Sequence, residues 1–175
     1  GEMTLIETAE AARTVTPPAD ADLAFATQTT LSVDDTAEII SILQFRFPEI
    51  RGPRGEDICY ATTNRQNAVK HIAEKCDLML VVGAENSSNS QRLVEVALRA
   101  GAKSGRLVAD CQAIDWAEVD AATHIGLSAG ASAPENLVMD IIDEMRARYD
   151  LQLDEDALVE ETLTFKLPSI LSDGA

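Results

Sequence analysis

The sequence predicts an α/β fold in which parallel strands alternate with helices in βαβ units. The first observation is a short, continuous apolar run at residues 78–82, which is typical of a strand buried on both faces of a parallel sheet. The second observation is that strand-like runs alternate with longer segments of helical periodicity between residues 57 and 149. This alternation predicts a parallel sheet with helices on both faces and right-handed crossovers between strands.

Residues 1–54 contain one clear break and one well-marked helix start. Two prolines within residues 16–20 end the first predicted helix. Ser32, followed three residues later by Asp35, resembles a capping box, and Pro48 ends the helix that begins there. The predicted elements are a strand at 3–7, a helix at 9–15, a strand at 23–27 and a helix from 32 to 47.

Residues 55–149 follow the alternation more regularly. Gly101 stands where helices commonly end. Ser132 and Glu135 form a full capping box, with Pro134 in the first turn of the following helix. The predicted strands are 57–61, 78–82, 105–109 and 124–127, and the predicted helices are 65–75, 89–100, a short one around Trp116 and one from Ser132 to about residue 149.

Composition shifts divide the chain into three parts. A loop rich in glycine and proline at residues 51–55 is a candidate boundary. The chain is therefore divided into 1–54, 55–149 and a tail at 150–175. The tail is acidic up to Glu161 and then carries one predicted strand at 163–167, so we expect it to pack across another part of the molecule.

The charge balance excludes several classes of partner. Fourteen Lys and Arg face thirty Asp and Glu, which gives a net charge of −16, and aromatic residues make up only 4% of the chain. Nucleic acids and anionic membranes both require a basic surface, and base stacking requires aromatic side chains. No apolar run approaches the roughly 20 residues of a membrane span. Three cysteines are too few for a disulfide scaffold and indicate a reducing cytoplasm.

Polar residues gather where each predicted strand gives way to a helix, at residues 27–30, 62–66, 83–90 and 128–132. Ligands of α/β sheets bind at this end of the strands, and free N–H groups at helix starts favour anions. Helix capping alone explains Ser32 and Ser132 well, but it does not explain five consecutive polar residues at 86–90. This run suits a phosphate or diphosphate. The usual P-loop and dinucleotide-binding motifs are missing from the sequence.

The cysteines and histidines give weaker signals. The spacing of Cys59, Cys76 and Cys111 fits no C-x-x-C pattern. Cys76 and Cys111 are expected to be inert apolar side chains, and on spacing alone Cys59 is also expected to be a structural thiol. His71 and His124 have no acidic or cysteine partner at ligand spacing, so neither is a candidate catalyst.

Long motifs in a fixed order nevertheless carry a family resemblance. They lie at residues 27–36, 57–66, 82–90 and 129–134, and the similarity continues through 165–168. In this order they resemble the C-terminal part of the 4-hydroxy-3-methylbut-2-enyl diphosphate reductases, the LytB/IspH family. The resemblance covers almost the whole chain and is far more specific than any one short motif.

The resemblance implies a fold and an activity. Family members have three α/β lobes around a central cavity, so residues 1–54 would be part of the second lobe and 55–149 the third. In the family, a [4Fe–4S] cluster and two electrons remove the substrate hydroxyl as water, which yields isopentenyl and dimethylallyl diphosphate in the non-mevalonate isoprenoid pathway. An electron donor such as ferredoxin or flavodoxin is implied.

The resemblance also implies roles for individual residues. Cys59 matches a cysteine ligand of the cluster. Thr29 matches a threonine that holds the substrate near the reacting hydroxyl and helps to relay a proton. The residues that match diphosphate ligands are Ser87, Ser88, Asn89 and Ser132.

Several functional residues of the family have no counterpart in this sequence. These are the other two cluster cysteines, the diphosphate-binding histidines and the proton-donating glutamate, so no catalytic residue is assigned here. We therefore expect that this chain alone neither retains a cluster nor acts as a reductase, and that its partial lobe exposes apolar surface. The alternative is a non-catalytic diphosphate-binding module, or a subunit completed by another chain.

Overall fold

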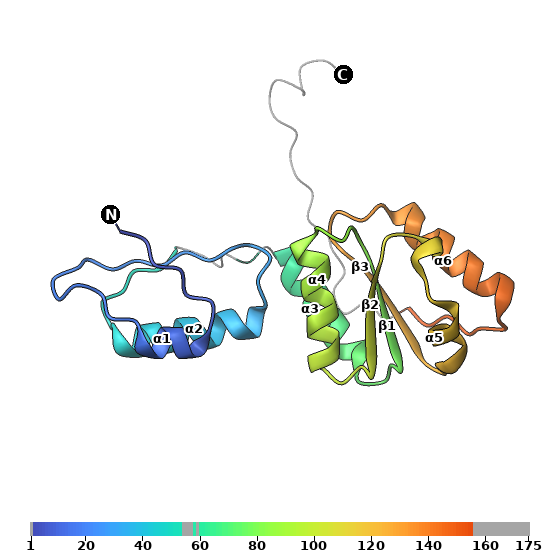
Figure 1. Ribbon diagram of the computed structural model, residues 1–175, viewed down its shortest axis with the longest axis horizontal. Helices are drawn as coiled ribbons and strands as arrows, with labels where there is room; N and C mark the ends of the chain where they lie inside the picture. Colours follow the sequence, from blue (N-terminus) through green and yellow to red (C-terminus); the bar gives the residue numbers. More distant parts are fainter. Residues whose placement is uncertain (1, 54–57, 59, 156–175) are drawn as a thin grey trace, which may run out of the picture.

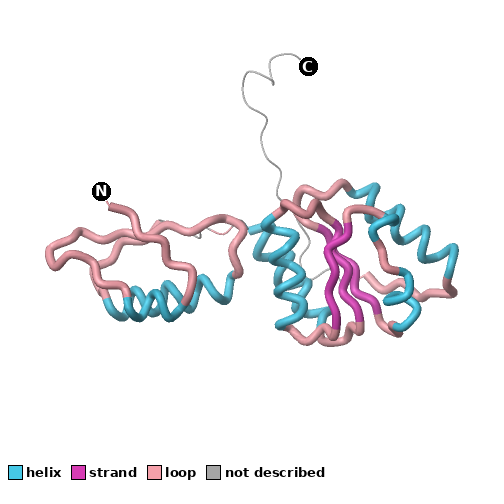
Figure 2. The backbone as a smooth tube through the Cα atoms, in the orientation of Figure 1, coloured by secondary structure: helices cyan, strands magenta, loops and turns pink. Residues whose placement is uncertain are grey.

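The computed structural model describes residues 2–53, 58 and 60–155. Its centre is a three-stranded parallel sheet in the order β2-β1-β3. The strands are β1 (Leu78–Val82), β2 (Ser104–Val108) and β3 (Ile125–Ala129), drawn in magenta in Figure 2. The predicted α/β class with parallel strands is confirmed.

β1 is the central strand, and all five of its residues are buried. It pairs in parallel with both neighbours, and Leu80 is level with Arg106 of β2 and with Leu127 of β3. A strand in this position has no face in water, so every side chain must be apolar. This is why the continuous apolar run identified it correctly.

Helices cover both faces of the sheet (Figure 1). The helices α3 (Tyr60–Ala73) and α4 (Ser88–Arg99) pack on one face, and α5 (Trp116–Ala121) and α6 (Glu135–Arg148) pack on the other. Met79 and Val81 of β1 belong to the first core, whereas Leu78, Leu80 and Val82 belong to the second. Alternate residues of β1 thus fill two separate cores, as the two-residue period of a strand requires.

The N-terminal part is built from α1 (Ala9–Thr14) and α2 (Val33–Arg46) with extended segments beside them. Ser32 caps α2 as predicted, since its Oγ accepts a hydrogen bond from Asp35 N at 3.3 Å. The strand predicted at 3–7 is wrong. That predicted at 23–27 is reduced to a single bridge between Ala24 and Arg51. No neighbouring strand extends the pairing in this described segment, and an isolated pair of strands is marginal in water.

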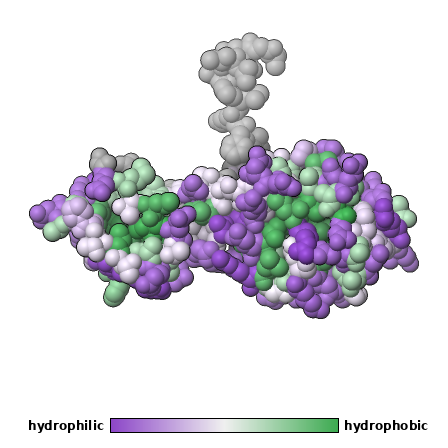
Figure 3. Space-filling view, in the orientation of Figure 1, coloured by the Kyte–Doolittle hydropathy of each residue, from purple (hydrophilic) through white to green (hydrophobic). Residues whose placement is uncertain are grey.

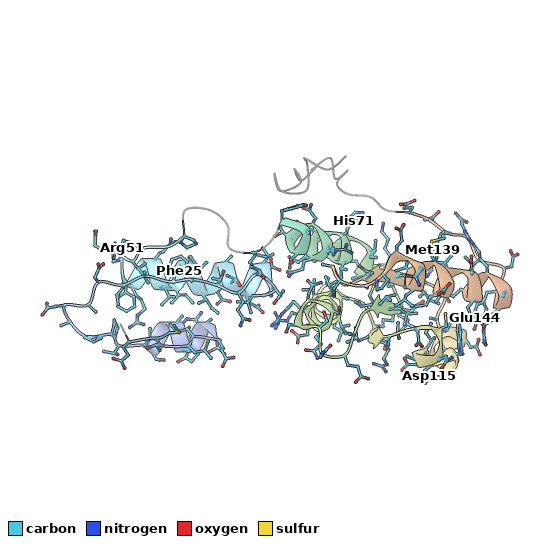
Figure 4. All side chains as sticks on the ribbon, turned by 90° about the horizontal axis from the view of Figure 1, so that it is seen from above. Phe25, Arg51, His71, Asp115, Met139 and Glu144 are labelled. Atoms are coloured by element: carbon cyan, nitrogen blue, oxygen red, sulfur yellow. The ribbon has the colours of Figure 1, made fainter. Side chains whose placement is uncertain are left out.

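Apolar side chains of the N-terminal part are also exposed. Phe25 and Arg51 lie on neighbouring segments there (Figure 4). Figure 3 shows hydrophobic surface over this part as well as over the sheet. Met3, Leu5 and Phe45 are 94%, 79% and 88% exposed. The expected apolar exposure is therefore present, while the division of the chain at residues 54 and 149 stays a prediction.

Two other predicted elements need comment. The strand predicted at 57–61 is wrong for Tyr60 and Ala61, which begin α3, while residues 57 and 59 lie outside the described part. Buried positions Thr62, Gln66, Val69 and Ala73 recur at helical spacing, so this helix has a buried face that reaches further towards the N-terminus than predicted. The tail beyond residue 155, with its predicted strand at 163–167, also lies outside the described residues. In the part that is described, no helix is both long and apolar enough to cross a membrane.

Asp77 organises the amino edge of the sheet. Its Oδ2 accepts hydrogen bonds from Thr123 N and His124 N, both at 2.9 Å, and its Oδ1 accepts from Lys103 Nζ at 2.7 Å. The hydrogen bond from Lys103 and those from the two backbone N–H groups hold the pKa of the Asp77 carboxyl well below its usual value. The carboxylate thereby joins the segments that lead into β1, β2 and β3.

Replacing Asp77 should destabilise the protein in a pH-dependent way. A carboxyl whose pKa is lowered by folding stabilises the native state above its unfolded pKa of about 3.9, and this contribution is lost as the pH falls through the folded value. Asp77→Asn should therefore lower Tm at pH 7, and the difference from the wild type should shrink as the pH falls below about 4. Thermal unfolding followed by circular dichroism between pH 7 and pH 3 measures both effects.

Asp143→Asn is the matched control, because the contact of Asp143 with Arg146, at 3.3 Å, is exposed and lies within one helix. Its difference in Tm from the wild type should be small at every pH. A pH-independent deficit for Asp77→Asn would contradict the role assigned to this carboxylate.

Candidate functional site

The carboxyl ends of the strands meet at one edge of the sheet. Gly83 follows β1, and its N–H donates to Val108 O of β2 at 3.0 Å. Gly130 follows β3, and its N–H donates to Val82 O of β1 at 2.8 Å. The loops leaving β1 and β3 are thus tied together before they turn into α4 and α6, where ligands of parallel sheets bind.

The first turn of α4 presents a group of hydroxyl and amide side chains at this edge. Ser87 is the N-cap, and its Oγ accepts hydrogen bonds from Ser90 N at 3.3 Å and from Ser90 Oγ at 2.9 Å. Because Ser87 Oγ accepts twice, its own proton is left for an acceptor outside the helix. Ser88 is exposed in the same turn. The start of α4 therefore offers neutral donors together with its free N–H groups.

Ser90 is wedged between the two loop glycines. It is fully buried, and a Cβ built on Gly83 or Gly130 would lie only 2.2 Å or 2.1 Å from its Oγ. Any other residue at these two positions would push against Ser90. The glycines thus allow the first turn of α4 and the β3–α6 loop to approach each other closely.

Asn89 is the most informative residue of the group. It is 8% exposed, and both Oδ1 and Nδ2 are buried without a hydrogen-bond partner among the described residues. A Cβ on Gly130 would lie 3.7 Å from its Nδ2, so the amide faces the same edge. A buried amide with no partner is costly and calls for an explanation. A ligand oxygen at this position would supply the acceptor that Nδ2 lacks.

Ser132 lies on the neighbouring turn, and its predicted capping role is wrong. The turn closes through a hydrogen bond from Ala133 N to Gly130 O at 2.9 Å. The helix α6 then begins at Glu135 with Pro134 as its N-cap, and no side chain caps it. Ser132 lies inside this turn, before the helix starts, so its hydroxyl does not reach the helical N–H groups. Ser132 is exposed beside Gly130 and is free of the structural role expected for it.

The remaining candidates lie elsewhere. Thr29 is exposed in a turn of the N-terminal part, and no contact joins it to the α4 group in the described structure. Cys59 lies outside the described residues. The structure thus gathers Ser87, Ser88 and Asn89 on one turn, with Ser132 on the adjacent loop.

Sequence reasoning missed how two further residues act. Ser90 was grouped with the other polar residues, although its role is to fill the space between Gly83 and Gly130. Arg65, in α3, donates from Nη1 to Ala129 O at 2.9 Å, directly before Gly130. The glycines that follow two predicted strands were the only sequence signal for the close approach, and nothing in the sequence indicated the contact of Arg65.

The described residues do not fit an iron–sulfur cluster. Within residues 2–53, 58 and 60–155, no three His, Cys, Asp or Glu side chains gather as a metal site. Burial raises the pKa of the Cys76 and Cys111 thiols, which favours their protonated form over the thiolate that binds iron. Cys76 donates to Ile72 O at 3.1 Å, in keeping with the structural role predicted for it.

The packing around Ser90 predicts a selective rescue. Gly130→Ala should destabilise the protein by about 1–3 kcal/mol through overpacking, and Ser90→Ala alone by about 1 kcal/mol through its lost hydrogen bond. The double variant Ser90→Ala/Gly130→Ala should be more stable than Gly130→Ala, because the clash with Oγ is removed and the nearest remaining atom is the residue 90 Cβ, at 3.3 Å. Urea unfolding of the four proteins gives the coupling energy.

Gly83→Ala is the matched comparison. A Cβ at position 83 would still lie 2.7 Å from the residue 90 Cβ after Oγ is removed. Ser90→Ala should therefore relieve little of the strain at position 83. Equal relief at both glycines, or simple additivity at Gly130, would show that Ser90 is not wedged as described.

The chain is similar to known proteins of one family. A family model described as "LytB protein" matches residues 1–146. The chain is 55% identical to a 4-hydroxy-3-methylbut-2-enyl diphosphate reductase of Hyphomonas neptunium over 172 residues, which are 98% of this chain and 55% of that protein. Identity to the reductase of the same name from Agrobacterium fabrum is 57% over 165 residues, which are 94% of this chain and 47% of that protein.

A solved structure gives the same assignment. The E-1-hydroxy-2-methyl-but-2-enyl-4-diphosphate reductase from Plasmodium falciparum superposes with a TM-score of 0.83 at 33% identity, covering 96% of this chain and 53% of that one. The chain spans about half the length of the curated relatives it matches. Because the family model matches well over half of the chain, this protein belongs to the LytB family.

Proposed function

We propose that the start of α4 and the adjacent β3–α6 loop bind the diphosphate group of 4-hydroxy-3-methylbut-2-enyl diphosphate, and that the chain serves in its reduction. The named activity of the relatives and the geometry of the edge both support this. The observation that carries the proposal is Asn89, whose buried amide lacks a partner beside Ser87, a hydroxyl with a proton to donate. Two donors at a helix start suit an anionic oxygen.

The electrostatics of this site differ from those of a basic phosphate site. The chain carries −16, so the long-range field repels an anion. The proposed donors are uncharged hydroxyl and amide groups, and the helix dipole acts only within about one turn of the N-terminus. The attraction is therefore local, which reconciles an anionic substrate with an acidic protein.

The other functional assignments stay predictions. They comprise Thr29 at the reacting hydroxyl, Ser88 and Ser132 at the diphosphate, Cys59 as a ligand of a [4Fe–4S] cluster, and a ferredoxin or flavodoxin in the cytoplasm as electron donor. The predicted inactivity of this chain by itself is equally untested. Reductase turnover by the chain after reconstitution with iron and sulfide would contradict it, whereas diphosphate binding without turnover would favour the alternative of a binding module.

Asn89 predicts that stability and binding change in opposite directions. Asn89→Leu replaces an unpartnered buried amide by an apolar side chain of similar size, so it should stabilise the fold by about 1–2 kcal/mol. The same change removes a donor to the ligand and should weaken binding of inorganic diphosphate at least tenfold. Thermal unfolding and isothermal titration calorimetry measure the two effects on one preparation.

Asn67→Leu is the control, because Asn67 is an exposed amide on α3, away from the sheet edge. It should leave the affinity for inorganic diphosphate within about twofold of the wild type, as expected for a surface change. Absence of diphosphate binding by the wild-type chain, or unchanged affinity in Asn89→Leu, would overturn the proposed site.

A further inference from the structure

Gln66 joins the sheet part of the molecule to the start of α2. It lies in α3 and is fully buried. Its Oε1 accepts from Val33 N at 3.0 Å, and its Nε2 donates to Leu31 O at 2.8 Å. Both ends of the amide therefore meet the backbone on either side of Ser32, the N-cap of α2. A buried amide whose oxygen and nitrogen are both hydrogen-bonded to the backbone fixes the position of that backbone.

Two ion pairs support the same segment from outside. Lys70, one turn further along α3, contacts Asp34 with Nζ–Oδ distances of 2.8 Å and 2.6 Å. Arg99 of α4 contacts both carboxylate oxygens of Asp35, at 2.7 Å and 2.6 Å. These pairs are largely exposed and individually weak. The buried amide of Gln66 is thus the principal link between α3 and residues 31–35.

The neighbouring residue of α3 makes a contact in the other direction. Arg65 Nη1 bonds Ala129 O at the end of β3, beside the loop that carries Ser132. Consecutive residues of α3 therefore hold two segments: Arg65 contacts the edge where α4 begins, and Gln66 contacts the entrance to α2. Thr29 stands two residues before Leu31, in the turn that leads to this entrance. Figure 1 shows this entrance running beside α3 and α4.

We infer that Gln66 is a positioning residue, which sets the place of Thr29 relative to the diphosphate donors at the start of α4. The inference rests on the proposed function, in which Thr29 meets the substrate hydroxyl. Without the amide, residues 31–33 lose both of these buried hydrogen bonds, and the ion pairs of Asp34 and Asp35 that support the same segment are exposed and lie five and six residues beyond Thr29. The hydroxyl contact then loses its geometry, while the diphosphate donors keep theirs because β1, β3 and Ser90 hold them.

The test compares two ligands that differ in the hydroxyl alone. Calorimetry of the full chain is carried out with 4-hydroxy-3-methylbut-2-enyl diphosphate and with dimethylallyl diphosphate. Gln66→Ala should weaken the hydroxylated ligand about five- to tenfold and leave dimethylallyl diphosphate within about twofold. Thr29→Ala should show the same selectivity, and the double variant should be no weaker than either single one, since both remove one contact.

Amide hydrogen exchange provides a readout that needs no ligand. In Gln66→Ala the Val33 amide loses its acceptor, so its exchange and that of residues 28–32 should quicken about tenfold or more, while the amides of β1 remain protected. Gln66→Glu is the second variant, in case Gln66→Ala does not fold. It keeps the acceptor for Val33 N, but the oxygen that replaces Nε2 faces Leu31 O and repels it. The Val33 amide should therefore exchange more slowly than in Gln66→Ala, while the preference for the hydroxylated ligand should still fall below that of the wild type.

Gln44→Ala removes an exposed amide from α2 and should change neither the exchange nor the affinities. Equal weakening of both ligands in Gln66→Ala, full additivity with Thr29→Ala, or unchanged exchange at Val33 would each overturn the inference. If the wild type binds dimethylallyl diphosphate but gains nothing from the hydroxyl, the inference is overturned and the diphosphate site stands. If the wild type binds neither ligand, the proposed function is overturned, and the inference about Gln66 is overturned with it.

Discussion

The burial of β1 on both faces is the constraint on which the rest of the structure depends. A five-residue strand with no exposed side chain needs a neighbour on each edge and a helical layer on each face. Its polar neighbours in sequence can therefore lie only beyond its two ends. Asp77, at the amino end, ties the segments before β2 and β3 to the central strand. At the carboxyl end, Gly83 N–H donates to Val108 O of β2, and Gly130 N–H, after β3, donates to Val82 O. The edge held by Asp77 and the candidate site thus lie at opposite ends of the same strand.

Asp77 and Asn89 show how the two ends differ. Asp77 accepts three hydrogen bonds from groups of the protein nearby, as expected of a side chain whose role is stability. Asn89 is as well enclosed as a core residue and satisfies none within the described part of the chain. Proteins keep such unfavourable groups where function requires them. This contrast supports the proposal that Asn89 binds a ligand, whereas Asp77 has a structural role.

Elements that depend on local periodicity were predicted correctly from the sequence. Predictions failed where the structure depends on contacts between segments that are distant in the sequence. The strand at Leu78–Val82 and the helix at Ser88–Arg99 follow from apolar patterns that no neighbour overrides. The strand expected at 23–27 failed because a strand needs a partner, which a pattern cannot supply. The sequence around Ser132 predicts a helix cap, but Ser132 lies in the turn closed by the hydrogen bond from Ala133 N to Gly130 O, before the helix begins. The hydrogen bonds of Gln66 to Val33 and Leu31 span 33 and 35 positions of the sequence. No periodic pattern could have predicted them.

Ser90 determines more than the local packing. Because its side chain fills the space between Gly83 and Gly130, the loop after β1 and the loop after β3 have no room to move towards each other. The donors attached to them are then already in place when a ligand arrives, and little conformational entropy remains to be lost on binding. A site assembled from short neutral side chains gains its affinity from such preorganisation rather than from charge. At the proposed diphosphate site, this rigidity would take the place of the lysine and arginine side chains that bind anions in more basic proteins.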